Sequence, residues 1–154
     1  MANNHTAGAA ARTFAPSELC QRMLAKTSKG TCGPCILYLE DGTIFYGRAC
    51  GAEGTATGEV CFNTSLEGYF EVMTDPSYAG QIVTMTYPQI GNYGIDETDV
   101  QSAFPGDAVR PASAPAMRGM IVRDMCATPS NWRSAVSVPE YLCAHGIVAI
   151  EGVD

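Results

Sequence analysis

The hydrophobic and polar positions change their period along the chain, and the first clear pattern is that of a β-hairpin. An apolar run over residues 36–40 ends at Asp41-Gly42, a strong short-range signal for a tight hairpin turn. Residues 43–48 then alternate β-branched or aromatic side chains with polar ones, as a half-buried strand does. We therefore predict two antiparallel strands joined by a tight turn.

Two more strands are predicted in the same half of the chain. Residues 59–63 alternate apolar and polar side chains, and residues 81–87 form a β-branched run that a proline ends. Between them, residues 64–69 predict a short helical turn that Gly68 breaks. The chain then passes into a turn at Asp75-Pro76-Ser77, where proline fixes φ and aspartate accepts a local hydrogen bond.

The last third of the chain predicts an insertion, a helix and two strands. Residues 104–116 are rich in Pro, Ala and Ser without periodicity, which indicates an exposed insertion. Strand-like runs follow at 119–122 and 147–150. Between these runs, Ser137 and Glu140 have capping-box spacing and predict a helix that ends near residue 145. The whole pattern predicts a β-rich, mixed α/β domain.

The composition is that of one globular domain, but charge and residue types differ between the first 34 residues and the rest of the chain. The 154 residues are 46% hydrophobic and 16% charged, with a net charge of −7, and no apolar run reaches the length of a spanning helix. The acidic balance argues against nucleic-acid or membrane-surface partners. Residues 1–34 are basic and Ala-rich, whereas 35–154 are strongly acidic. We predict that residues 1–34 are a disordered extension, and the alternative is an organellar transit peptide.

One cysteine pair has the spacing of a redox active site. Cys32-Gly33-Pro34-Cys35 resembles a thioredoxin-type motif, which requires its first thiol at the N-terminus of a helix. Here a predicted strand follows the pair, so the dithiol is interpreted as incidental. The seven cysteines lack a disulfide framework, which favours a reducing compartment. A thiol oxidoreductase or a binding module that uses this motif remains the alternative function.

No catalytic constellation is evident in the sequence. His5 lies in the predicted extension, and His145 lies at a helix end, where an imidazole is more often a cap than a base. The Gly-rich loop over 51–58 lacks the Lys and Ser/Thr of a phosphate-binding loop. Four nearby acids are interpreted as solvated surface: Glu59, Glu67, Glu71 and Asp75. The chemistry alone predicts a domain without a self-contained active site.

Several short strings become informative when they are taken together in their order. They are Leu39-Glu40-Asp41-Gly42-Thr43, Gly58-Glu59-Val60, Phe62-Asn63-Thr64-Ser65, Thr74-Asp75-Pro76-Ser77-Tyr78-Ala79-Gly80-Gln81, Thr86-Tyr87-Pro88, Ile90-Gly91-Asn92-Tyr93-Gly94, Ser130-Asn131-Trp132-Arg133 and His145-Gly146-Ile147. Each string is modest evidence, but the series over about 36–154 is specific. Together they resemble the small subunit of glutamine-dependent carbamoyl phosphate synthetase.

The resemblance covers only the N-terminal domain of that family, residues 35–154 of this chain. It implies a swivelling β/β/α fold, an α/β class with two sheets and a helical layer. Family members continue into a glutamine amidotransferase domain with a Cys nucleophile and a His–Glu pair, none of which matches a position here. We therefore expect the chain to be a fragment of a longer polypeptide, and inactive when isolated.

The resemblance also implies a reaction and its partners. The family's small subunit hydrolyses L-glutamine, and the ammonia passes to a large subunit that makes carbamoyl phosphate from bicarbonate for arginine and pyrimidine synthesis. This domain would dock onto the large subunit and lend Ser77 to the glutamine pocket, whereas without the family the Ser77 hydroxyl would be interpreted as closing its turn. No catalytic residue, metal or cofactor is expected in this chain, since ATP and magnesium belong to the large subunit.

Three features depart from the family pattern. Gln89 stands where the family usually has histidine, the 104–116 insertion is longer than typical, and the extension over 1–34 has no counterpart. The resemblance gives no role to Asn63, Gly80 or Arg133. The expected location is the cytoplasm, or an organelle if the extension is a transit peptide.

Overall fold

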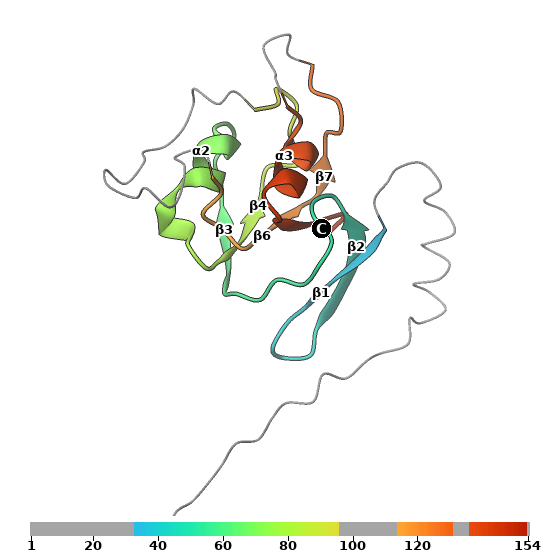
Figure 1. Cartoon of the computed structure of the whole chain (residues 1–154). Helices are drawn as coiled ribbons and strands as arrows, with labels where there is room; N and C mark the ends of the chain where they lie inside the picture. The colour runs from blue at the N-terminus through green and yellow to red at the C-terminus, as the bar shows by residue number, and fades with distance from the viewer. Residues whose placement is uncertain (1–32, 96–113, 131–135, 154) are drawn as a thin grey trace, which may run out of the picture. The chain divides into compact units, whose positions relative to one another are not determined.

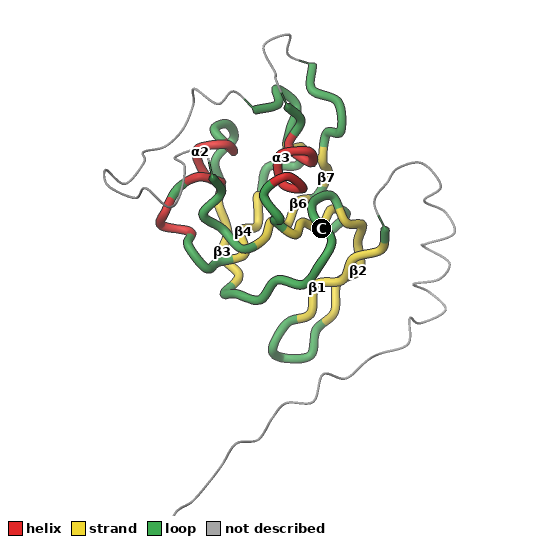
Figure 2. The backbone as a smooth tube through the Cα atoms, viewed as in Figure 1, coloured by secondary structure: helices red, strands yellow, loops and turns green. Residues whose placement is uncertain are grey.

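The computed structural model describes residues 33–95, 114–130 and 136–153 (Figure 1). A six-stranded sheet has the order β1-β2-β8-β6-β4-β3, and β5 pairs with β7 in a second sheet of two strands. The described elements in chain order are β1 Pro34–Tyr38, β2 Ile44–Ala49, β3 Val60–Asn63, α2 Tyr69–Thr74, the 3-10 helix η1 Pro76–Tyr78, β4 Ile82–Met85, β5 Gln89–Ile90, β6 Gly119–Val122, β7 Asp124–Met125, α3 Val138–Ala144 and β8 Val148–Glu151. The predicted mixed α/β, β-rich class is confirmed (Figure 2).

The predicted hairpin is present as β1 and β2, which pair antiparallel from Pro34 opposite Arg48 to Tyr38 opposite Ile44. Its turn uses Gly42 at φ 91°, a conformation that glycine adopts without steric cost. The Asp41 carboxylate accepts the Thr43 N–H at 2.8 Å. This is the local bond expected of aspartate in a tight turn.

Four adjacent strands of the six-stranded sheet are parallel and are built from two strand–helix–strand connections. β3 passes through α2 to β4, and β6 passes through α3 to β8, with β3, β4, β6 and β8 parallel. β8 also pairs antiparallel with β2, which joins the hairpin to the parallel strands. At that junction Arg48 and the largely buried Glu151 form an ion pair at 2.6 Å. The second carboxylate oxygen of Glu151 accepts the Met125 N–H at 3.1 Å, so this residue also ties β8 to β7.

The hydrophobic core lies between the helices and one face of the large sheet. The inward positions of α2 and α3 pack in one cluster with alternate residues of the strands, among them Val83, Met120 and Ala149. The rings of Phe70 and Tyr141 meet edge to face, with centroids 5.4 Å apart, and join the two helices. Strand residues that alternate with these core residues point to the opposite face of the sheet, which therefore carries a separate set of apolar side chains.

The predicted capping box of α3 is confirmed. The Ser137 hydroxyl accepts the Glu140 N–H at 3.4 Å, and the Glu140 carboxylate accepts the Ser137 N–H at 3.0 Å. The Ser137 hydroxyl also bonds the same carboxylate at 2.7 Å. These bonds from Ser137 hold the pKa of the Glu140 carboxyl below its ordinary value.

The prediction that Gly68 breaks a helical turn is wrong. Gly68 is instead the N-cap residue of α2, with φ 74°. Because glycine has no side chain, it cannot itself accept a hydrogen bond from the first N–H groups of the helix. The Tyr93 hydroxyl accepts the Gly68 N–H at 2.8 Å and the Tyr69 N–H at 3.3 Å. The cap comes from a distant loop, so the residues around Gly68 could not reveal it.

Three other expectations are revised. β4 ends at Met85, two residues before the predicted end, and the two-residue strands β5 and β7 were not expected. Most of the predicted 104–116 insertion lies outside the described residues. Its last residue, Ala116, is buried rather than exposed, and its N–H donates to the Met73 carbonyl at 2.8 Å. No helix within the described ranges is long and apolar enough to cross a membrane.

Candidate functional site: a serine turn and an apolar sheet face

Ser77 lies in the middle of η1, on a turn with a defined local structure. The Asp75 side chain accepts the Ser77 N–H at 2.8 Å and caps the turn, and proline occupies its first position. The Tyr78 N–H donates to the Asp75 carbonyl at 3.1 Å. The Ser77 side chain is exposed, and its hydroxyl has no hydrogen-bond partner among the residues that the structure describes.

The same turn is attached to the end of β3. The Asn63 amide N–H donates to the Tyr78 hydroxyl at 2.9 Å. The Asn63 side-chain oxygen accepts the Ser65 N–H at 2.8 Å, and its backbone carbonyl accepts the Thr86 N–H at 3.1 Å. Asn63 therefore links β3, the following loop, the end of β4 and the serine turn. No spacing in the sequence pairs it with Tyr78.

A second polar group lies just before β4. The Gln81 amide donates to the Glu59 carboxylate at 3.2 Å, and the Cys61 thiol donates to the Gln81 amide oxygen at 3.5 Å. Burial, and then the Glu59 charge, raise the pKa of the Cys61 thiol. A thiol in this state is a poor nucleophile, so the group is structural.

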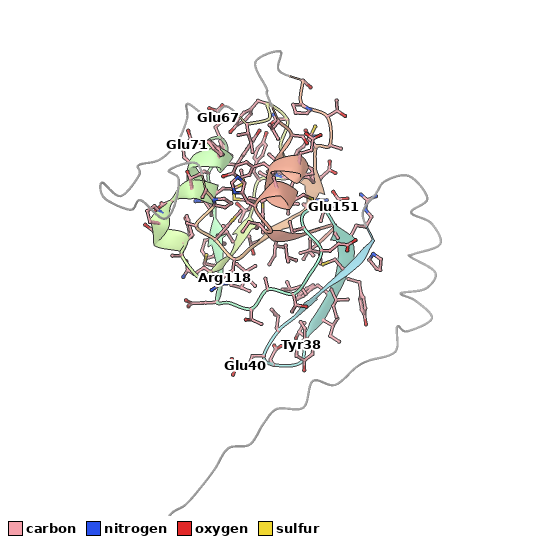
Figure 3. The ribbon with its side chains drawn as sticks, in the orientation of Figure 1. Tyr38, Glu40, Glu67, Glu71, Arg118 and Glu151 are labelled. Atoms are coloured by element: carbon pink, nitrogen blue, oxygen red, sulfur yellow. The ribbon has the colours of Figure 1, made fainter. Side chains whose placement is uncertain are left out.

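The four acids that could have suggested paired-carboxylate catalysis do not meet in one site. Glu59 bonds Gln81 and Asp75 caps η1. Glu71 lies in the first turn of α2 and Glu67 just before that helix, at the other end of the domain from the hairpin (Figure 3). Within the described ranges, no group of three or more His, Cys, Asp and Glu residues could hold a metal ion.

The described histidine has a structural setting. His145 is the C-cap of α3, and its ring lies 4.5 Å from that of Tyr141, centroid to centroid. The backbone N–H of His145 donates to the Tyr141 carbonyl at 3.1 Å, so the residue lies at the helix end that the sequence predicted. Nothing in this setting couples the ring to a nucleophile.

The redox motif is only partly within the described residues, because Cys32 lies outside them. Cys35 lies in β1 opposite Gly47, in a strand rather than at the N-terminus of a helix. Burial raises the pKa of the Cys35 thiol. This setting is the opposite of the one that activates a redox thiol.

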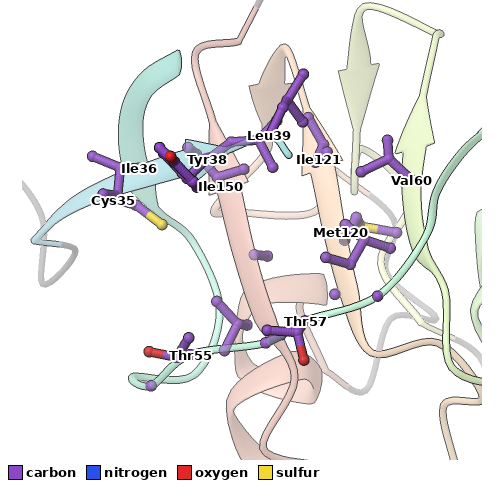
Figure 4. A pocket seen from close by; sticks show the side chains of 18 of the residues that line it. Cys35, Ile36, Tyr38, Leu39, Thr55, Thr57, Val60, Met120, Ile121 and Ile150 are labelled. Carbon is purple, nitrogen blue, oxygen red and sulfur yellow. The ribbon is translucent and has the colours of Figure 1, made fainter. Parts of the chain in front are cut away.

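The sheet face opposite the helices forms an apolar groove of about 770 Å³ (Figure 4). Its floor includes Ile82, Ile121 and Ile150, which alternate along their strands with core residues. The strand β1 and the loop over 54–59 form its sides. The groove holds no cluster of polar groups that could carry out a reaction.

Large hydrophobic side chains are exposed along both edges of the sheet. Phe62 on β3 and Leu66 in the loop after it are 73% and 71% exposed. Ile36 and Tyr38 on β1, at the opposite edge, are also more than half exposed. Large apolar side chains exposed in this way are a feature of surfaces that contact other proteins.

Three further residues were singled out from the sequence: Gly80, Gln89 and Arg133. Gln89 is exposed at the start of β5. Gly80 adopts φ 84° after η1, where a side chain would be strained. Arg133 lies outside the described residues.

These features define a β-rich α/β domain, with an exposed serine on a fixed turn, exposed apolar side chains and no assembled catalytic group among its described residues. A sequence model of the carbamoyl-phosphate synthase small chain, CPSase domain, matches residues 37–154. The chain belongs to the carbamoyl-phosphate synthase small chain family. The predicted family resemblance is thereby confirmed.

Individual relatives agree with this assignment. The chain is 54% identical over 119 residues to the carbamoyl phosphate synthase small chain of Solidesulfovibrio magneticus, and 54% identical over 121 residues to that of Xanthomonas axonopodis pv. citri. It is 52% identical over 119 residues to that of Thermotoga maritima. These matches cover 77–79% of this chain but only 28–29% of the relatives. The chain therefore spans less than a third of the relatives' length.

Proposed function

We propose that this chain is the N-terminal part of the small chain of a glutamine-dependent carbamoyl phosphate synthase. The small chain would release ammonia from glutamine for a large chain that makes carbamoyl phosphate from bicarbonate with ATP and magnesium. The family match over residues 37–154 is the observation that carries this proposal. Use of the product in arginine or pyrimidine synthesis, and a cytoplasmic location, are parts of the proposal that follow from the family alone.

Ser77 would contribute its hydroxyl to the glutamine pocket. Its turn is fixed by Asp75 and its side chain is exposed, which supports contact with a group outside this domain. A hydroxyl can both donate to and accept from an amino-acid substrate. The nucleophile and base for glutamine hydrolysis would lie in another part of the small chain.

Docking onto a large chain is the second proposed role. The exposed apolar side chains at the sheet edges, and above all Phe62 and Leu66, support an interaction function. The thiol-oxidoreductase alternative gains no such support, because Cys35 lies in a strand and burial raises its thiol pKa.

The decisive experiment is steady-state kinetics of Ser77→Ala in a family-length small chain assembled with its large chain. We expect the KM for glutamine to rise about tenfold, as for loss of one or two substrate hydrogen bonds. Synthesis from free ammonia should not change, because it bypasses the glutamine pocket. Ser130→Ala, another exposed serine, is the matched control. An unchanged KM in Ser77→Ala would contradict the assignment.

The inactivity of this chain by itself is tested separately. The 154-residue protein, incubated with millimolar glutamine, should release no more ammonia than its Ser77→Ala variant. Ammonia release above that background would refute the proposal that the glutaminase chemistry lies elsewhere.

For the docking role, a family-length small chain should copurify with an ATP-using large chain, and failure to do so would count against docking.

A further inference from the structure

We infer that Asn63 is a positioning residue for the glutamine pocket, and that it acts on Ser77 through the hydroxyl of Tyr78. This inference rests on the proposed role of Ser77. Asn63 lies at the end of β3 and Tyr78 directly follows the serine. We assign neither residue a direct contact with the substrate. What they determine is where the Ser77 hydroxyl stands when a substrate arrives.

A serine on an exposed turn binds a ligand well only if its backbone is already in place. If the turn moved freely, binding would have to order it, and that cost would be subtracted from the hydrogen bond gained. The turn is three residues long, and its backbone hydrogen bonds are local: Tyr78 N–H to Asp75 O, Ala79 N–H to Pro76 O and Gln81 N–H to Tyr78 O. Local bonds fix the shape of a turn but not its position relative to the sheet.

The Asn63–Tyr78 bond supplies that attachment. It joins positions fifteen residues apart at 2.9 Å and is partly buried, so water competes with it less than at an exposed bond. Among the described residues, it is the side-chain hydrogen bond that connects η1 to a strand of the sheet. The Tyr78 ring packs against the core, which leaves the hydroxyl as the polar contact at its tip.

Asn63 is itself held on several sides, as an anchor must be. Its side-chain oxygen accepts the Ser65 N–H, and its carbonyl accepts both the N–H and the hydroxyl of Thr86, at 3.1 and 3.2 Å. The amide is thereby oriented with its nitrogen toward Tyr78. The ends of β3 and β4, rather than the loop around the serine turn, therefore hold the turn in its position.

The test measures glutamine kinetics in the assembled synthase for Tyr78→Phe, Ser77→Ala and the double variant. Tyr78→Phe keeps the ring in the core and removes only the hydroxyl. We expect its KM for glutamine to rise about three- to tenfold with kcat unchanged. In the Ser77→Ala background the same substitution should have no further effect, because the group it positions is gone. Tyr46→Phe, on the partly buried strand β2, is the matched control.

Asn63→Asp provides the conservative comparison. The aspartate keeps an acceptor for Ser65 and can accept a hydrogen bond from the Tyr78 hydroxyl, so the KM for glutamine should stay within about twofold of the wild-type value. Asn63→Leu, which can make neither bond, should match Tyr78→Phe.

The outcomes separate the two proposals. If Ser77→Ala raises the KM but Tyr78→Phe does not, the positioning role is refuted and the role of Ser77 stands. If Tyr78→Phe has the same effect with and without the Ser77 hydroxyl, the bond is merely structural and the inference also fails. If Ser77→Ala leaves the KM unchanged, the proposed role of Ser77 fails, and the positioning role fails with it.

Discussion

The Tyr93 hydroxyl lies 2.8 Å from the backbone nitrogen of Gly68, the N-cap residue of α2, which precedes it by twenty-five residues in the chain. Its ring also stacks on that of Tyr69, with centroids 4.2 Å apart, and the Tyr69 hydroxyl donates to the Gly94 carbonyl at 2.6 Å. Burial raises the pKa of both phenols, so they remain neutral well into the alkaline range. The pair fastens α2 to the loop after β5.

Tyr93→Phe should destabilise the 154-residue chain by about 1 kcal/mol. The substitution keeps the stacked ring and leaves the Gly68 and Tyr69 N–H groups without their shared acceptor, as in loss of a helix cap. Urea denaturation measures the change, and Tyr38→Phe on the exposed hairpin is the control. Equal stability of the two variants would show that the hydroxyl does not cap α2.

Gly47→Ala should destabilise the fold by about 2 kcal/mol. A methyl group at Gly47 would collide with the Glu151 carbonyl oxygen and lie 2.7 Å from Ile150 Cγ1, where β2 packs against β8. Gly33→Ala meets nothing within 4 Å and is the matched control. The two unfolding curves should separate clearly, and a stable Gly47→Ala variant would contradict the close approach of β2 to β8.

Glu140→Gln should reduce the acid sensitivity of the chain. Because the pKa of the Glu140 carboxyl is lowered from 4.5 in the folded state, its contribution to stability is present above that value and is lost as pH falls through the lowered one. Glutamine does not titrate, so the variant should lose less unfolding free energy than wild type between about pH 5 and about pH 3. Denaturation curves across this range test it, with Glu67→Gln as control. Parallel pH dependence in wild type and Glu140→Gln would contradict the prediction.

The cysteines should differ in their alkylation rates. Cys143 is exposed on α3, whereas burial raises the pKa of the Cys35 thiol and Cys50 is in the core. Iodoacetamide at neutral pH, followed by peptide mass spectrometry, should modify Cys143 before Cys35 and Cys50. Preferential modification of Cys35 would instead revive the redox interpretation of its motif.

The sequence predicted those elements whose signals are local. Asp41-Gly42 determines its own turn, and Ser137 and Glu140 cap each other within one helical turn, so the hairpin and α3 agree with prediction. α2 was missed because its cap comes from Tyr93, outside any window around Gly68. β5 and β7 are two residues long and exist only because they pair with each other, which no periodicity can reveal.

The candidate site shows the same division. The Asp75-Pro76-Ser77 turn was predicted from its residue types, and the structure has it as η1. The Asn63–Tyr78 bond depends on how β3 and the turn pack in space. Ser77 was singled out because the short sequence motifs resemble those of a known family. The residue types around Ser77 did not by themselves indicate a substrate-binding role.

The place of β8 in the sheet has a consequence for how the molecule forms. It lies between β2 and β6 yet comes last among the described strands, so the hairpin made first has no neighbour until β8 has emerged from the ribosome. Pairing across so long a stretch of chain makes the closing step slow, and the unsatisfied edge of β2 stays available to other chains meanwhile. Assembly should therefore depend on chaperone protection during synthesis more than the small size of the domain suggests.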